Sequence, residues 1–136
     1  MLSPESKAEF KSVMAAYLKL CPQGDCSDGP HDPIGEWDVS RVTDMSHMFY
    51  GATSFNADIS KWDVSVSRAT DMGRMFSDAK SFNGELSKWD VSGVEDTSYM
   101  FLGAEAFDSD LLKWDVSRVF LAAPPPCCQP FPRLIF

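Results

Sequence analysis

The sequence lacks any long hydrophobic run, because no stretch of 18 or more apolar residues occurs among its 136 residues. A membrane-spanning helix needs about 20 such residues, so we expect no transmembrane segment. The first ten residues, M-L-S-P-E-S-K-A-E-F, also lack the apolar centre of a secretory signal peptide. The residues themselves therefore leave the localisation unknown.

Basic residues are also scarce: the sequence has 12 Lys and Arg but 20 Asp and Glu, which gives a formal net charge of −8. Binding to phosphate groups needs a basic surface, so this balance argues against nucleic acid and anionic membranes as partners. The composition is otherwise that of a folded protein, with 44% hydrophobic and 24% charged residues. Its length matches about one ordinary domain.

Signals of catalysis are missing as well. The chain has two histidines, His31 in a Pro-rich loop and His47, and it contains no G-x-S-x-G, H-E-x-x-H or G-x-x-x-x-G-K motif. Its carboxylates recur from unit to unit, whereas a general acid and base need different environments to separate their pKa values. We therefore expect no enzyme activity and no cofactor.

What the chain does contain is an internal repeat. The tetrapeptide W-D-V-S starts at Trp37, Trp62, Trp89 and Trp114, at spacings of 25, 27 and 25 residues. A fixed period of this length is typical of stacked repeat architectures, in which neighbouring units bury each other's apolar side chains. The sequence thus divides into an N-terminal cap helix and loop (1–33), three and a half repeats (34–119) and a Pro/Cys-rich tail (120–136).

Two local patterns within each unit suggest secondary structure. The W-x-V part alternates apolar and polar residues, as a half-buried strand does. The stretch T-D-M-S-H-M-F places Met45, Met48 and Phe49 on one helix face, with Thr43 at the N-cap position. We therefore predict an α/β repeat solenoid of short parallel strands and short helices. The predicted strands lie near 36–40, 61–65, 88–92 and 113–117.

Different elements flank the repeats. Apolar residues recur at helical spacing over 3–21, with Ser3 as a candidate N-cap and Pro4 at the first helical position, which predicts a helix that covers the first unit. Residues 120–136 carry five prolines, which excludes a helix or a central strand. This tail is either a truncated end or a plug over the last unit. If that end is uncapped, we expect self-association through it.

The repeated W-D-V-S-x-V-T-D-M-S-x-M-F, followed by S-F-N-x-D-I, resembles the BspA-like leucine-rich repeats, a mycoplasma-type surface-protein repeat of unknown function. The resemblance covers about 34–119. It implies an LRR-like right-handed coil in surface-exposed or secreted proteins that are linked to adhesion or binding. It supplies no catalytic residues.

The strand model predicts outward rows of identical side chains. A carboxylate row at about 5 Å spacing repels itself, so either local hydrogen bonds from Ser stabilise it, or it binds Ca²⁺ or a cationic partner. The first alternative is the simpler one, and we expect no dedicated metal site. The two candidate binding rows are Asp38, Asp63, Asp90 and Asp115, and Ser40, Ser65, Ser92 and Ser117.

Positions that differ between units carry any specificity. His47, Arg74 and Tyr99 occupy one such position, and Tyr50, Ser77 and Leu102 another, so we expect both sets to face solvent. Cys21 and Cys26 are close enough in sequence to form a disulfide in an oxidising compartment. These features together predict a non-catalytic module that binds a protein or glycan ligand. The alternatives are a structural fragment of a longer repeat protein and a Ca²⁺-dependent adhesin module.

Overall fold

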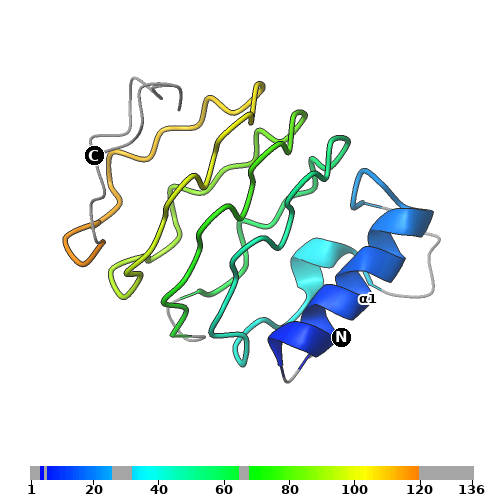
Figure 1. The fold of residues 1–136 in the computed structure, drawn as a ribbon, viewed down its shortest axis with the longest axis horizontal. Coiled ribbons are helices and arrows are strands. Elements are labelled where there is room, and N and C mark those ends of the chain that lie inside the picture. Colours follow the sequence, from blue (N-terminus) through cyan, green and yellow to red (C-terminus); the bar gives the residue numbers. More distant parts are fainter. Residues whose placement is uncertain (1–3, 5, 26–31, 65–67, 120–136) are drawn as a thin grey trace.

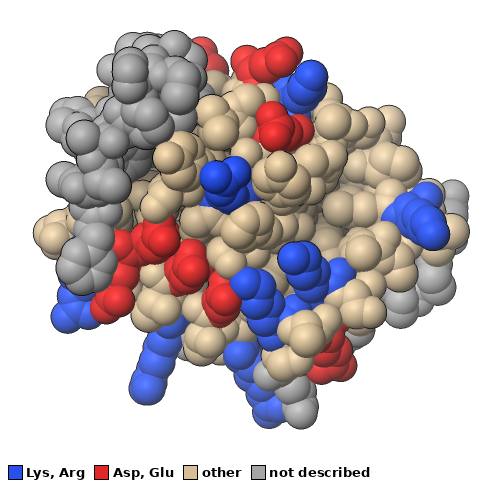
Figure 2. All heavy atoms as spheres, in the orientation of Figure 1, with Lys and Arg blue, Asp and Glu red and all other residues tan. Residues whose placement is uncertain are grey.

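The computed structural model describes residues 4, 6–25, 32–64 and 68–119. In these residues the regular elements are one α-helix, α1 (Lys7–Leu20), and one 3-10 helix, η1 (Ile34–Glu36). Figure 1 shows α1 at one end of the molecule and the repeats as successive loops of chain that lie side by side. Acidic side chains form a short row across the visible face, and basic side chains lie beside it (Figure 2).

The predicted α/β repeat solenoid is wrong, because the described residues contain no β-strand and no sheet. The β-type pairing of the described residues is limited to isolated parallel bridges, from Asp44 to Asp71 and from Asp71 to Asp96. The W-D-V-S segments fold as turns instead of strands. In the first of them the Ser40 N–H donates to the Asp38 carboxylate at 3.0 Å. An aspartate that binds the backbone two residues later closes a turn and ends the extended run.

The short helices predicted inside the repeats are also absent. In the first unit the N–H of Tyr50 donates to the His47 carbonyl at 3.1 Å, and that of Ala52 to the Phe49 carbonyl at 3.0 Å, which are i to i+3 turns. His47 has a φ of 61°, a left-handed conformation that no α-helix contains. Thr43 therefore does not cap a helix. The i, i+3, i+4 apolar spacing arises from consecutive turns.

Every second N–H group in these turns donates to a carbonyl of the next unit and not to one of its own unit. Between residues 45–51 and 71–77, and again between 72–78 and 96–102, four N–H groups of one unit donate to four carbonyls of the following unit. We call this set of bonds the one-way ladder. Its members are Met45 to Asp71 (2.9 Å), His47 to Gly73 (3.0 Å), Phe49 to Met75 (2.8 Å), Gly51 to Ser77 (2.9 Å), Met72 to Asp96 (2.8 Å), Arg74 to Ser98 (2.9 Å), Phe76 to Met100 (2.9 Å) and Asp78 to Leu102 (2.7 Å).

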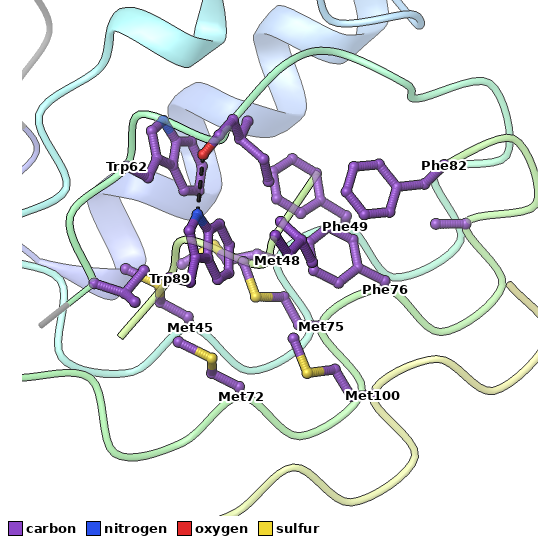
Figure 3. Close-up of a cluster of buried hydrophobic side chains, with 14 of the residues drawn as sticks. Met45, Met48, Phe49, Trp62, Met72, Met75, Phe76, Phe82, Trp89 and Met100 are labelled. Atoms are coloured by element: carbon purple, nitrogen blue, oxygen red, sulfur yellow. Dashed lines mark hydrogen bonds between the residues drawn. The ribbon is translucent and has the colours of Figure 1, made fainter. Parts of the chain in front are cut away.

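The predicted core is confirmed, because the repeated apolar side chains fill one continuous interior. Trp62 and Trp89 stack with ring centroids 6.4 Å apart and an interplanar angle of 8°. The Trp89 Nε1–H also donates to the Ile59 carbonyl at 3.1 Å, so each indole satisfies its polar atom inside the core. Figure 3 shows the methionines of successive units beside one another, next to the stacked indoles and phenylalanines.

Helix α1 covers the first unit, at the place where the sequence predicts a helix. Its N-cap is Ser6, whose hydroxyl accepts from the Glu9 N–H at 3.2 Å, so the prediction that the helix starts with Pro4 is wrong. Ser3 lies outside the described residues. The Phe10 ring meets Trp62 edge to face at 5.6 Å, and the Lys7 Nζ reaches the Asp44 carboxylate at 2.7 Å. The helix therefore contacts both the apolar end of the stack and its polar edge.

Candidate functional site

The predicted Asp and Ser rows belong to the W-D-V-S turns. One carboxylate oxygen of each described turn accepts the backbone N–H of the serine two residues later. This confirms the alternative in which local hydrogen bonds hold the carboxylates. The described pairs are Asp38 with Ser40 (3.0 Å), Asp90 with Ser92 (3.1 Å) and Asp115 with Ser117 (3.0 Å).

Charge effects show that these carboxylates lie near one another. The charges of Asp115 and Asp63 act to raise the pKa of Asp90, but hydrogen bonds from the side chain and backbone of Ser92 outweigh them and lower that pKa. Hydrogen bonds from Ser117 likewise lower the pKa of Asp115. Asp90 and Asp115 are therefore charged at neutral pH and tied to their turns. Ser65 lies outside the described residues.

A second surface is more varied in its chemistry. We define the variable row as His47, Tyr50, Arg74 and Tyr99. The Arg74 guanidinium lies over the Tyr99 ring, 4.8 Å from its centroid, and the His47 and Tyr50 rings are 5.8 Å apart. Tyr50 is 52% exposed and Tyr99 38% exposed, which places them among the most exposed large hydrophobic residues of the described chain. The structure thus brings Arg74 and Tyr99 together.

The prediction that the neighbouring variable position faces solvent holds for one residue and fails for another. Tyr50 is exposed, and Leu102 is half-buried. Ser77 is completely buried, and its hydroxyl has no hydrogen-bond partner among the described residues. In the middle unit this position, which holds the small side chain of Ser77, therefore belongs to the interior.

The backbone holds the variable row in an unusual conformation. His47, Arg74 and Tyr99 occupy the same place in three successive units and have φ values of 61°, 55° and 55°. A left-handed conformation costs a residue with a Cβ atom roughly 1–2 kcal/mol, and glycine would relieve most of it. Large polar or aromatic side chains at all three positions are therefore retained against a local energetic cost. Such strain is common at functional positions.

A third row lies three residues before the variable row in each unit. We define the acidic row as Asp44, Asp71 and Asp96, which the parallel bridges place side by side. The helix predicted over T-D-M-S-H-M-F puts Asp44 directly after its N-cap Thr43, in the first turn, and so the sequence did not indicate these residues as a surface. Their recurrence in each T-D-M motif was the available signal. Asp44 binds Lys7 of α1, whereas Asp71 accepts the Gly73 N–H at 2.8 Å and is half-buried.

No group of three or more His, Cys, Asp or Glu residues that could hold a metal ion occurs in the described part of the chain. The Ca²⁺ alternative for the Asp rows therefore has no coordination site to support it there. Cys21 is buried and disulfide-bonded. Its predicted partner, Cys26, lies outside the described residues, so that pairing stays a prediction.

Comparison with known families places the repeats. Residues 24–123 match the family model described as a Mycoplasma protein of unknown function, DUF285. The chain belongs to the DUF285 family. The match covers the repeats that carry both the variable and the acidic row, and it confirms the mycoplasma-type part of the resemblance. It does not confirm a BspA-like leucine-rich repeat.

Membership of the DUF285 family assigns no activity to these rows. No curated protein and no solved structure matches the chain. None of the helices that the structure describes combines the length and apolar character needed to cross a bilayer.

Proposed function

We propose that the protein is a non-catalytic binding module whose variable row holds a protein ligand. The observation that carries this proposal is the repetition of a strained residue with a large polar or aromatic side chain at one place in three units: His47 and Tyr99, which are exposed, and Arg74, which is half-buried. Tyr and Arg are the side chains most often found at the energetic centres of protein interfaces, because they bury large rigid surfaces and still form hydrogen bonds.

The row is also organised before any ligand binds. The one-way ladder fixes the backbone of each turn, since the His47 and Arg74 N–H groups donate to the next unit at 3.0 and 2.9 Å. The contact between Arg74 and Tyr99 restricts both side chains. A rigid surface loses less conformational entropy on binding, which favours affinity. The resemblance to surface-exposed repeat proteins suggests that such binding serves adhesion at a cell surface.

The test is a selection of binders from a displayed library of random peptides on the immobilised full chain. We expect the enriched peptides to lose binding to the variant Tyr50→Ala/Arg74→Ala/Tyr99→Ala. The matched control is Leu20→Ala/Leu112→Ala/Arg118→Ala, which removes two exposed apolar side chains and one arginine elsewhere. Binding that survives the first variant, or is lost equally in both, would refute the proposal. A glycan array probed with the same variants would show instead whether the row holds a carbohydrate.

A further inference from the structure

We propose that Asn83 is a site of spontaneous deamidation, in which the backbone nitrogen of Gly84 displaces the side-chain amide and leaves an aspartate or an isoaspartate. The sequence contains two asparagines, Asn56 and Asn83, at the same place in successive units. Glycine follows Asn83 and alanine follows Asn56, so the second site is a natural control for the first. Neither asparagine belongs to the variable row, and the site is therefore independent of the proposed function.

The side chains of both asparagines link neighbouring units. The Oδ1 atom of Asn56 accepts the Asn83 N–H at 2.9 Å, and the Oδ1 atom of Asn83 accepts the Asp108 N–H at 2.8 Å. When a nucleophile attacks the Cγ atom of an asparagine, negative charge develops on Oδ1, and a donor that is already in place stabilises this charge. Both asparagines have such a donor, so this bond activates them alike.

The residue after each asparagine distinguishes the two sites. A Cβ atom on that residue hinders the approach of its backbone nitrogen to the Cγ atom, whereas glycine has no Cβ atom and reaches more backbone conformations. Ala57 is buried, while Gly84 is half-buried and Asn83 is exposed to water. Among the described residues the Gly84 N–H has no hydrogen-bond acceptor, so no such bond holds its proton. The structure thus leaves the nucleophile, the amide and water in reach of one another at Asn83.

Packing of the core accounts for the glycine after Asn83. A Cβ atom on Gly84 would collide with the ring of Phe82, which is completely buried in the stack. Even alanine at this position would therefore require the ring to move. The close approach that favours glycine here is also what leaves Asn83 beside an unhindered nitrogen.

The reaction needs water and no other co-reactant. Hydroxide removes the proton of the Gly84 nitrogen, which attacks the Asn83 Cγ atom and closes a cyclic imide. The bond between Cγ and Nδ2 breaks, and the departing group takes a proton from water, which releases ammonia and restores the hydroxide. Water then opens the ring. Breaking the new bond between nitrogen and Cγ gives aspartate, whereas breaking the original peptide bond gives isoaspartate.

The two products should affect the stack differently. The third unit has Asp108 at this place, and an aspartate at position 83 can still accept the Asp108 N–H, although the two charges then repel each other. Isoaspartate instead adds a methylene group to the main chain. The extra length displaces the acceptor of the Asp108 N–H and also the Gly84 carbonyl, which accepts the Ser109 hydroxyl at 2.7 Å. The isoaspartate product is therefore the destabilising one.

The experiment follows both asparagines while the folded full chain is incubated at mildly alkaline pH. Trypsin cleaves after Lys80 and Lys88 and releases residues 81–88 with Asn83, whereas residues 42–61 carry Asn56, so mass spectrometry measures each conversion separately. We expect Asn83 to convert at least about tenfold faster than Asn56. The rate should rise with pH, and both aspartate and isoaspartate should form.

Two variants sharpen the test. Ala57→Gly places a glycine after Asn56 and should bring the rate there close to that of Asn83. Asn83→Asp should unfold at nearly the same urea concentration as the fresh chain, whereas an aged sample rich in isoaspartate should unfold at a lower one.

The proposal is overturned if Asn83 stays intact in the folded chain, even where it reacts in the urea-unfolded chain, or if it converts no faster than Asn56. An Asn56 that stays unreactive in Ala57→Gly would refute the role of the following glycine. A clearly lower urea midpoint for Asn83→Asp would refute the tolerance of the stack for the aspartate product.

Discussion

Phe76 and Phe82 stack face to face within one unit, with ring centroids 4.2 Å apart and an interplanar angle of 1°. Each ring also stacks on its counterparts in the next unit, Phe101 at 5.7 Å and Phe107 at 5.9 Å. The pair therefore joins the two sides of a unit to each other and to the rest of the stack. Both rings are completely buried.

The first prediction concerns this pair. Phe82→Ala should lower the free energy of unfolding by about 3–5 kcal/mol, because it removes a buried ring and leaves a cavity that stacked neighbours cannot fill. Urea denaturation followed by tryptophan fluorescence measures the change. Leu112→Ala is the control, since Leu112 is 61% exposed and its loss should cost less than about 0.5 kcal/mol. Equal effects of the two substitutions would contradict the stacked core.

The second prediction concerns Ser77. Its buried hydroxyl has no partner among the described residues, so Ser77→Ala should raise the free energy of unfolding by about 1 kcal/mol. Thermal and urea unfolding of the full chain measure the gain. Ser81→Ala is the matched control, because the Ser81 hydroxyl donates to the Thr53 carbonyl at 2.7 Å and its loss should be destabilising. A loss of stability in Ser77→Ala would show that the hydroxyl is bound.

The third prediction compares two glycines. Gly103 has a φ of 72°, and a Cβ atom there would collide with the Asp78 Oδ1, so Gly103→Ala should destabilise the protein by at least about 1–2 kcal/mol. Gly93 is outside the left-handed region and a Cβ atom would meet nothing within 4 Å. Gly93→Ala should therefore be neutral or stabilise by up to about 1 kcal/mol through the unfolded chain. Similar unfolding midpoints for the two variants would refute the turn geometry.

The fourth prediction concerns Lys7, which joins α1 to the acidic row. Burial raises the pKa of Asp44. Hydrogen bonds from Lys7 and Ser46, together with the charge of Lys7, lower it by a larger amount, so the pKa lies below its ordinary value of 3.8. A lowered pKa contributes stability above the ordinary value, and that stability is lost as the pH falls through the folded-state pKa.

Lys7→Met should therefore destabilise the protein at pH 6, and the difference should shrink toward pH 2 as the pH falls through the folded-state pKa of Asp44. Urea midpoints of the two proteins at several pH values between these limits give the comparison. The control is Lys61→Met, which breaks a more exposed pair with Glu36 and should have a smaller effect. A difference that is independent of pH would exclude Asp44 as the partner that matters.

The period of the repeat predicts the interior well, because burial depends on which residues recur. Trp62, Met72 and Phe82 are all buried as their positions in the units require. The helix over Lys7–Leu20 is also predictable, since its apolar spacing continues for several turns. Long patterns average out local ambiguity.

The conformation within a unit is not predictable in the same way. Met45, Met48 and Phe49 have the spacing of a helix face, but consecutive turns with a left-handed residue place them on the same side as well. Whether the segment forms a helix or turns depends on the N–H groups of His47 and Phe49, which donate to carbonyls of the next unit. The sequence of a single unit does not indicate these bonds between units. Nor do Arg74 and Tyr99 indicate a positive φ, because neither residue type favours that region; His47 belongs to a type that is enriched there, but one such residue makes no pattern. The Asp-x-Ser spacing of Asp38 and Ser40 is compatible with a turn, whereas the alternation of Trp37 and Val39 fits a strand equally well.

The one-way ladder gives the stack an electrical direction. All of its peptide groups point the same way, so their dipoles add along the axis, with the negative pole at the first unit and the positive pole at the third. The ammonium group of Lys7 lies at the negative pole, where it is favoured. At the other pole, no described carbonyl accepts the N–H groups of Thr97, Tyr99 or Gly103. Two copies that met symmetrically there would bring donors against donors, so the backbone itself disfavours a twofold dimer through that edge.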